Sequence, residues 1–285
     1  MKQLRDTFTS GKLRFAGLKQ YIDGVVTGYT AYMLDPYLDK PETKGHVAFP
    51  PETIKSWVAE ADKEGFQIRF HAIGDGAVRL GLDAFEEAQK TNGKRDSRHA
   101  LEHVEVINPD DLSRFKELDV IASTQPSHLA FMPRTSHTSR VLEEKFPYLY
   151  PCKSLQDAGA SIAFGSDFPI APLSPMLQIF HAVTRVDYTG EDIWNEQERI
   201  RIAEALRAYT EGSAYSVHRE TELGTLEPGK LADIVVLDCD LFAVPLEKIP
   251  ETKVKMTIMD GEIVFTDLEQ QTNMIKFATN HAIEA

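Results

Sequence analysis

The chain has 285 residues, of which 42% are hydrophobic and 26% charged, a balance that indicates a globular protein and excludes a disordered or fibrous one. Acidic side chains outnumber basic ones by 44 to 31, and the net charge of −13 argues against a nucleic-acid partner because phosphate backbones are repelled. The apolar stretches are far shorter than the ~20 residues that span a bilayer, the N-terminus lacks a signal-peptide core, and two cysteines do not form a disulfide framework. We therefore expect a cytoplasmic protein without a membrane partner.

Short apolar runs alternate with helical patterns from residue 66 onward. Four runs have the character of buried strands: residues 66–74, 99–107, 119–124 and 161–167. Helical patterns cover residues 76–90, 110–119, 153–160 and 198–217. The last of these is the strongest amphipathic pattern. Strands that alternate with helices predict βαβ units and a parallel sheet, so the expected fold class is α/β.

The composition changes near residue 221. Residues 221–267 contain short strand patterns separated by Pro-Gly and Asp-Gly turns, with little helical pattern, and this predicts a small β module. For the tail, residues 268–285, helix and disorder are both open. We thus expect three parts: an α/β portion over residues 1–220, the β module, and the tail.

Three polar side chains stand at the ends of predicted strands: His71, His103 and Asp167. His103 follows His71 by 32 residues, about one βα unit, and precedes Asp167 by 64 residues, which allows two units. In a parallel barrel the carboxyl ends of the strands converge on one mouth, where two imidazoles and a carboxylate would suit a zinc-like ion. Taken singly, each residue has an ordinary alternative, as a hydrogen-bonded structural histidine or an aspartate that caps a turn.

Seven motifs follow one another in an order that resembles the amidohydrolase superfamily: HAIGDGAV, RHALEHVEVI, QPSHL, IAFGSDFPI, ALRAYTEGSA, GTLEPGKLADIVVLD and IMDGEIVF. The resemblance covers roughly residues 17–266 and is closest to metal-dependent hydrolases similar to N-substituted formamide deformylase. It implies a partial TIM-type β/α barrel, strands four to eight, followed by a β-sandwich portion. It also implies cleavage of a non-peptide C–N bond, such as an amide or formamide, in a small-molecule substrate. The cofactor implied is one or two ions of zinc or another divalent metal, which activate water.

The resemblance assigns metal-binding roles to four residues. His71 and His103 match the histidine ligands after strands five and six. Asp167 matches the aspartate after strand eight, which binds metal and takes the proton of the attacking water. Lys19 matches a lysine that some members carboxylate, and only that reaction makes a cationic side chain a ligand; the alternative is an ordinary surface or salt-bridged lysine. The chemistry is consistent, because a divalent metal lowers the pKa of bound water from about 15.7 to about 7.

Other residues of these motifs have open roles. Gln125 and His128, in QPSHL, are predicted to face the substrate. His99 is expected to support the site or simply to pack. Asp23 would orient Lys19 or cap its turn, and Asp75 is expected to shape the loop after the strand at 66–74.

Residues 126–151 form the longest candidate lid over the site. Two arginines, Arg134 and Arg140, would allow an anionic substrate, and the aromatic side chains of this segment would allow an apolar one. His137, within the same segment, has no motif context and is expected to be a surface or packing residue. The aromatic residues are Phe131, Phe146, Tyr148 and Tyr150.

The sequence departs from the family pattern at its beginning. The superfamily has an HxH pair at the end of strand one, and no HxH occurs in these 285 residues. Five strands of an eight-stranded barrel leave two open edges and an unfilled interior. We therefore expect a homo-oligomer or a missing N-terminal segment to complete the barrel.

The alternative function is a catalytically inactive or truncated amidohydrolase-like protein with an assembly or regulatory role. The sequence contains no GxSxG motif, which argues against hydrolysis by a nucleophilic serine. It also contains no GxGxxG or GxxxxGK[ST] motif, which argues against nucleotide binding.

Overall fold

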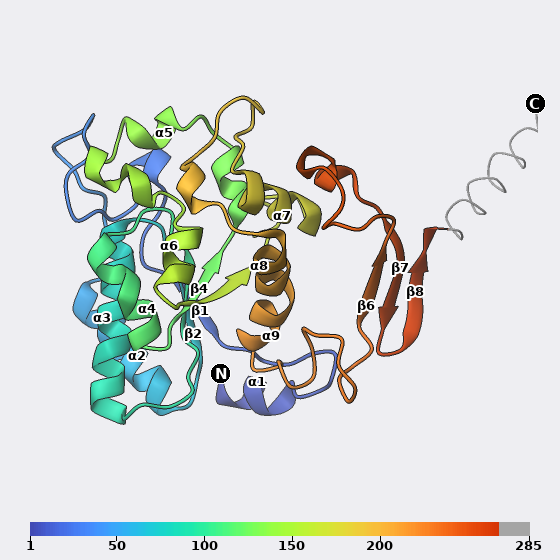
Figure 1. Cartoon of the computed structure of the whole chain (residues 1–285). Coiled ribbons are helices and arrows are strands. Elements are labelled where there is room, and N and C mark those ends of the chain that lie inside the picture. Colours follow the sequence, from blue (N-terminus) through green and yellow to red (C-terminus); the bar gives the residue numbers. More distant parts are fainter. Residues whose placement is uncertain (268–285) are drawn as a thin grey trace, which may run out of the picture.

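Five parallel strands run through the larger part of the molecule in chain order, as predicted from the alternation of strands and helices (Figure 1). The computed structural model describes residues 1–267. The strands are β1 (Leu18–Tyr21), β2 (Ile68–Ala72), β3 (Ala100–His103), β4 (Ile121–Thr124) and β5 (Ser161–Phe164). Each strand pairs in parallel with the next, with Tyr21 opposite His71 and Ala72 opposite His103. The partial barrel implied by the resemblance is thus present as a five-stranded sheet.

Helices and short 3-10 turns connect the strands. In chain order they are α1 (Lys2–Thr7), η1 (Val26–Gly28), α2 (Pro51–Lys63), α3 (Asp75–Asn92), η2 (Pro109–Asp111), α4 (Leu112–Glu117), η3 (Pro126–Ala130), α5 (Thr135–Thr138), η4 (Glu143–Tyr148), α6 (Cys152–Asp157) and α7 (Pro175–Thr184). The helical patterns at 76–90, 110–119 and 153–160 correspond to α3, to η2 with α4, and to α6. No helix of the described residues is long and apolar enough to cross a membrane.

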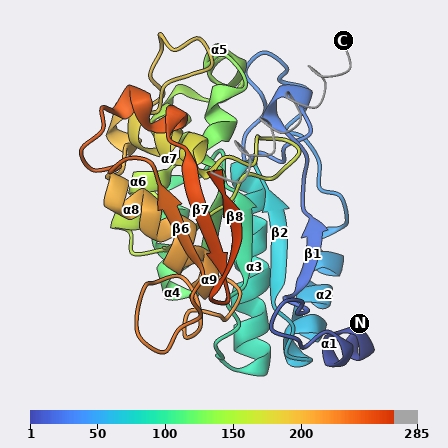
Figure 2. The same cartoon turned by 90° about the vertical axis from the view of Figure 1, so that its right-hand side faces the viewer.

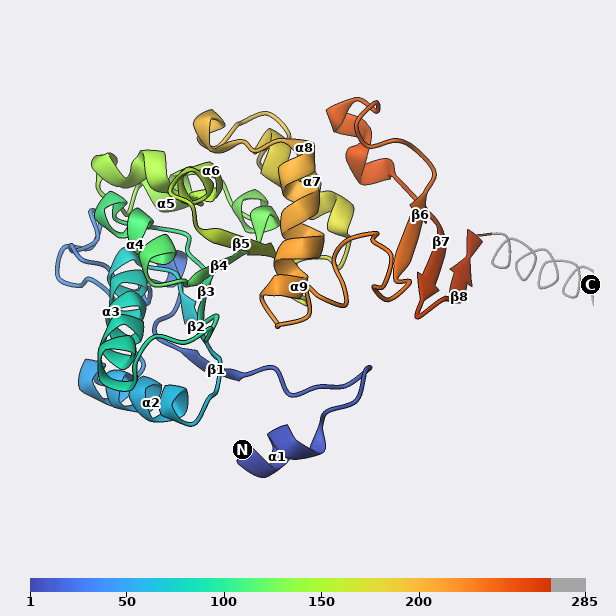
Figure 3. The ribbon, with the colours of Figure 1, turned by 60° about the horizontal axis from the view of Figure 1, so that its bottom comes forward.

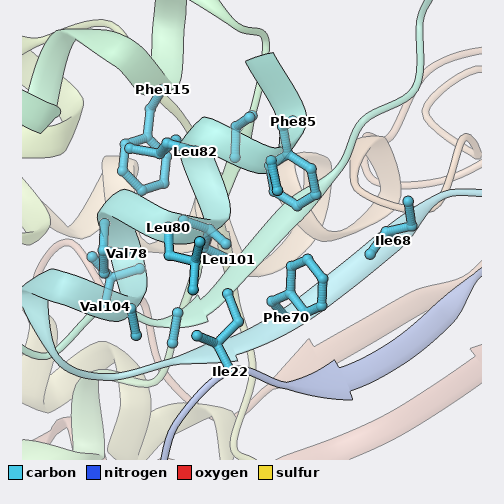
Figure 4. Packing of buried hydrophobic residues seen from close by; sticks show 14 of the residues in the cluster. Ile22, Ile68, Phe70, Val78, Leu80, Leu82, Phe85, Leu101, Val104 and Phe115 are labelled. Carbon is cyan, nitrogen blue, oxygen red and sulfur yellow. The ribbon is translucent and has the colours of Figure 1, made fainter. Parts of the chain in front are cut away.

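The main hydrophobic core lies between the sheet and helices α2, α3 and α4 (Figure 4). Alternation along β2 turns Ile68 and Phe70 toward these helices. Phe70 stacks on Phe85 of α3, with 5.6 Å between the ring centroids. The intervening residues of β2, Arg69 and His71, therefore face the other side of the sheet, where the candidate site lies.

That other side of the sheet is polar. Arg69 pairs with Glu102 of β3, with 3.2 Å between Nε and Oε1. Together with Lys19 and Ser123 they line an open cavity of about 400 Å³. Within residues 1–267, β1 and β5 each pair with a strand on one side only. The two open edges and the unfilled interior predicted for half of a barrel are therefore both present.

The segment predicted as one helix over residues 198–217 is divided in the structure. It begins with the last residue of η5 (Glu196–Glu198) and then contains α8 (Ile202–Arg207), the π-turn η6 (Ala208–Gly212) and α9 (Ser213–Tyr215). The helix begins at residue 202 because the Glu204 carboxylate accepts the backbone N–H of Arg201 at 2.7 Å. The π-turn places Gly212 against β5, where a Cβ atom would lie 2.1 Å from the carbonyl oxygen of Ile162. The prediction was right in type and wrong in the start and regularity of the helix.

A three-stranded antiparallel sheet follows near the C-terminus (Figure 2). Its elements are β6 (Ile234–Leu237), η7 (Leu246–Glu251), β7 (Val254–Met259) and β8 (Glu262–Thr266). Leu241 and Ile249 pack with Ile179 of α7 in one hydrophobic cluster. The connection between β6 and β7 thereby lies against α7, as the ribbon shows (Figure 3). The predicted β module is a single sheet within the described residues. The tail lies outside them, and the boundary at residue 220 stays a prediction.

A buried network holds the amino ends of β2 and β3. His99 accepts the backbone N–H of Ile68 at Nδ1 (3.1 Å), so Nε2 carries the proton and donates to Asp62 (3.1 Å). Asp62 also pairs with Arg95 at 2.7 Å and accepts from Asn92 at 2.9 Å. Burial raises the pKa of this carboxyl group, but the hydrogen bonds from His99 and Asn92, with the charge of Arg95, outweigh it and lower the pKa to about 2. His99 therefore has the packing role.

Asparagine in place of Asp62 is expected to lower the free energy of unfolding by about 2–4 kcal/mol at pH 7. Because the folded-state pKa of about 2 lies below the unfolded value of 3.8, the stability is fully present above the unfolded value and is lost as the pH falls toward 2. Urea unfolding of both proteins at neutral and acidic pH measures the difference, which should shrink in acid. Glu60→Gln, an exposed change on α2, is the control, and an equal loss in both variants would contradict the prediction.

Candidate metal centre

Three potential metal ligands meet at the carboxyl ends of the strands. His103 ends β3, His128 lies in η3 directly after β4, and Asp167 follows β5. One ligand atom from each lies within 4.8 Å of the others. His103 and Asp167 are brought together as predicted, and His128, predicted to face the substrate, takes the third position.

The backbone is constrained where these ligands stand. His103, Val104 and Asp167 have φ angles of 79°, 49° and 57°, in the left-handed region that residues with a side chain seldom adopt. Such conformations persist only where surrounding contacts fix them, and they gather at functional sites. Here the residues with positive φ lie at the carboxyl end of β3 and just after β5, where the loops around the site begin.

The two histidines of the cluster each have a nitrogen available to a metal. The Gln125 carbonyl oxygen accepts from Nδ1 of His103 at 2.8 Å, so the lone pair of that ring lies on Nε2. Burial, with the nearby His71, lowers the pKa of His103 to about 3, which keeps the ring neutral at pH 7. Nε2 of His128 is buried without a hydrogen-bond partner among the described residues, and it lies 3.9 Å from Oδ2 of Asp167.

His71 and Lys19 lie beside the cluster. The ring centroid of His71 is 4.5 Å from that of His103, and Nε2 of His71 donates to the carbonyl oxygen of Gly24 at 2.9 Å. Burial lowers the pKa of His71. Burial also lowers the pKa of Lys19, against the opposing charges of Glu102 and Asp167. Both residues line the same cavity, and their role as ligands stays a prediction.

The sequence analysis did not include Glu105 among the candidate site residues, although it lines the cavity beside the cluster. Oε1 of this buried carboxylate lies 3.7 Å from Nδ1 of His128, and Oε2 lies 3.2 Å from Nε2 of His137. Burial opposes ionisation of Glu105, but the interactions with His128 and His137 outweigh it and hold its pKa well below the usual range. The only signal in the sequence was a carboxylate two residues after His103. His137 is buried, as expected for a packing residue. Its Nε2 also lies 3.4 Å from the Tyr150 hydroxyl, which extends this network.

Asp23 caps a turn, and among the described residues it forms no hydrogen bond with Lys19. Its carboxylate accepts three backbone N–H groups, those of Tyr32, Ile73 and Gly74, at distances of 2.9, 3.0 and 2.9 Å. Burial raises the pKa of Asp23 to about 7, and these backbone donors oppose the rise. The capped segment includes the loop directly after β2, so Asp23 fixes the chain next to the site.

Asp75 shapes the same loop, as predicted. Its Oδ1 accepts the backbone N–H of Leu34 at 2.9 Å, and its Oδ2 pairs with the buried Lys145 at 2.6 Å. The preceding residue, Gly74, passes so close to Tyr32 that a Cβ atom would lie 2.2 Å from the Tyr32 carbonyl oxygen. The loop after β2 is thereby held from both sides.

A cavity of about 290 Å³ opens beside the cluster. Most of the predicted site residues lie on its polar side: Lys19, His71, His103, His128 and Asp167. Gln125 lines the neighbouring cavity on the polar face of the sheet. It does not line the cavity of about 290 Å³ itself, but it forms a hydrogen bond with His103, which does. Two imidazoles and a carboxylate beside an open space form a donor set that suits zinc, with room for water and a small molecule.

This fold and this site define a class. Three potential metal ligands at the carboxyl ends of parallel strands, beside a cavity, form an arrangement typical of metal-dependent β/α-barrel proteins. A sequence profile of the amidohydrolase family matches residues 2–265, and the chain belongs to this family. The resemblance seen in the motifs is thereby confirmed.

Two curated relatives and one solved structure illustrate the similarity. Protein LONG AFTER FAR-RED 3 of Arabidopsis thaliana is 35% identical over 241 residues, which cover 83% of this chain and 41% of that protein. N-substituted formamide deformylase of Arthrobacter pascens is 27% identical over 250 residues, which cover 87% and 45%. An uncharacterized metal-dependent hydrolase from Pyrococcus horikoshii matches with a TM-score of 0.75 and 31% identity, over 86% of this chain and 50% of its own. This chain thus spans half or less of the length of these proteins.

Proposed function

We propose that this chain carries the metal site of a hydrolase that cleaves a non-peptide C–N bond, such as an amide or formamide, in a small-molecule substrate. Family membership supports the reaction class. The cluster of His103, His128 and Asp167 supports a divalent metal, and its donor set favours zinc. The proposal rests above all on Nε2 of His128, because a buried nitrogen without a partner is costly and a metal ion would satisfy it.

Each residue of the cluster has a separate task in such a reaction. The bound ion would polarise the substrate carbonyl and lower the pKa of water. Asp167, with a side chain 41% exposed, would accept the proton of the attacking water and pass it to the leaving nitrogen. Gln125 holds the ring of His103, and Glu105 lies against His128, so both are positioning residues. A direct contact between Gln125 and the substrate stays a prediction.

A second ion depends on Lys19. For this residue to ligate, CO2 must convert its amine to a carbamate, and a lowered pKa favours the neutral amine that reacts. His71 would ligate through Nδ1, because Nε2 donates to Gly24. We therefore propose one ion held by the cluster, with a second only if Lys19 is carboxylated.

The open edges of the sheet favour a second candidate function. We propose that further strands, from a second copy of this chain or from a longer polypeptide, pair with β1 and β5, which each have one neighbour within residues 1–267. If the missing HxH pair is indispensable, the protein is an amidohydrolase-like assembly or regulatory protein without turnover. Bound metal distinguishes the two functions.

Elemental analysis of the purified chain tests the metal site. We expect about one equivalent of zinc, lost in the double variant His103→Ala with His128→Ala. His46→Ala is the control, because that histidine is exposed and lies outside the cluster. Light scattering on the same samples gives the oligomeric state. A parent protein without metal, or a double variant with undiminished metal, would contradict the proposed site.

A further inference from the structure

A row of five rings runs along the proposed site. Tyr21 packs on His71 at 4.7 Å between centroids, and Phe131 packs on His128 at 5.4 Å. His103 lies between the two histidines, at 4.5 Å from His71 and 5.6 Å from His128. Tyr21 and Phe131 therefore stand at the two ends of the row. His71 and His128 thus each have one of these two aromatic side chains directly beside them.

The same two residues belong to an apolar rim around the cavity, formed by Tyr21, Phe131, Met132 and Ile170. Their exposed fractions are 54%, 41%, 41% and 61%. Exposed apolar side chains that gather around a cavity mark a binding site. The cavity of about 290 Å³ is roughly twice the ~150 Å³ that holds benzene in an engineered protein, so an aromatic ring and an amide group fit together.

The charges around the cavity decide between the two substrate types that the lid segment left open. Arg134 and Arg140 form hydrogen bonds elsewhere in the chain, and neither lines the cavity. Among the described residues that line it, Lys19 is the only lysine or arginine, whereas Glu105 and Asp167 supply two carboxylates. The proposed zinc ion would offset these carboxylates at the metal position, so the choice is made at the apolar part of the lining. A carboxylate held against Phe131, Met132 and Ile170 would lose its water without gaining a cationic partner, whereas a neutral ring would not.

We propose that the apolar rim binds an uncharged, ring-sized substituent of the substrate, so that the site selects neutral aromatic amides over anionic and short aliphatic ones. The inference rests on the proposed function, because the amide is placed beside the metal ligands. Contact of the ring with Phe131 and Ile170 removes apolar surface of both partners from water, which favours binding. Selection thus comes from the rim, and reaction from the cluster.

Trp194 provides a reporter of binding that does not require turnover. The chain has two tryptophans: Trp194, which is fully buried and lines the cavity, and Trp57, which is 42% exposed on α2. In a Trp57→Phe background, fluorescence therefore reports on the cavity alone. The probes are N-benzylacetamide, N-methylacetamide and N-acetylglycine, which share an amide and differ in ring and charge. We expect N-benzylacetamide to bind at least about tenfold more tightly than either of the others.

Two variants separate the rim from its surroundings. Phe131→Ser with Ile170→Ser should abolish the preference for the ring. Leu173→Ser should keep it, because this leucine is 64% exposed in the same connection as Ile170 but does not line the cavity. Zinc content and unfolding temperature show that each variant is folded.

The outcomes of this experiment are separable from those of the proposed function. Equal affinity for the three probes, tighter binding of N-acetylglycine, or no binding of N-benzylacetamide by fluorescence and calorimetry would each overturn the inference. A protein that prefers the ring but hydrolyses no amide refutes the proposed function alone. A protein that hydrolyses amides without the preference refutes the rim alone.

Discussion

Asparagine in place of Asp167 is expected to lower kcat for amide hydrolysis about 1000-fold at saturating zinc, within the range for loss of a general base. The carboxylate lies 3.9 Å from Nε2 of His128 and lines the cavity, so it reaches both the proposed metal position and the substrate. An amide oxygen keeps a ligand atom in the same place but is not basic at neutral pH. Amine release from N-benzylacetamide measures the rate, with zinc determined on the same samples.

Asp110→Asn is the matched control for this change. Asp110 is an exposed carboxylate at the start of η2, outside the cavity, and its variant should keep the parental kcat. If Asp167→Asn weakens zinc binding and leaves kcat intact at saturating zinc, the carboxylate is a ligand and not a base. If it changes neither, Asp167 has no part in the reaction.

Residues at strand ends were the predictable part of the site. His103 and Asp167 end apolar runs whose spacing matches βα units, and parallel pairing places the carboxyl ends of neighbouring strands on one side. The prediction therefore required only the order and direction of the strands. Both follow from local hydrophobic patterns and from connections long enough to hold a helix.

His128 shows where local patterns stop. It lies in a 3-10 helix after β4, and whether its ring faces a substrate or other ligands depends on contacts with Glu105, 23 residues earlier, and Asp167, 39 residues later. Glu105 in turn is held by His137, which is 32 residues away in a segment without periodicity. Such contacts are decided by the packing of loops, which hydrophobic periodicity does not encode.

The turn after β1 was ambiguous for a related reason. An aspartate in a turn caps backbone groups or orients a neighbouring side chain, and the residue pattern is the same in both cases. The structure shows Asp23 bonded to a loop 50 residues away, that of Ile73, as well as to its own turn. The cap is therefore a tertiary contact, and its loss should affect the whole protein.

Alanine in place of Asp23 is expected to lower the free energy of unfolding by about 3–5 kcal/mol. The carboxylate accepts three backbone N–H groups, those of Tyr32, Ile73 and Gly74, at 2.9, 3.0 and 2.9 Å. Alanine supplies no acceptor, and a buried donor without a partner costs about 1–3 kcal/mol. Urea unfolding at neutral pH measures the loss. Zinc affinity should fall in parallel if His71 is a ligand, because the loop held by this cap begins directly after β2.

The control must remove a carboxylate of the same kind from an exposed turn. Asp39→Ala meets this condition, because Asp39 is exposed. Within residues 1–267 its carboxylate accepts a hydrogen bond from the Tyr29 hydroxyl at 2.8 Å and lies 3.9 Å from Nε of Arg140. Its cost should stay below about 1 kcal/mol. A loss in Asp23→Ala no larger than this would mean that water replaces the carboxylate as the acceptor. The loop beside the metal site would then be held by its close backbone contact at Gly74 and not by the cap.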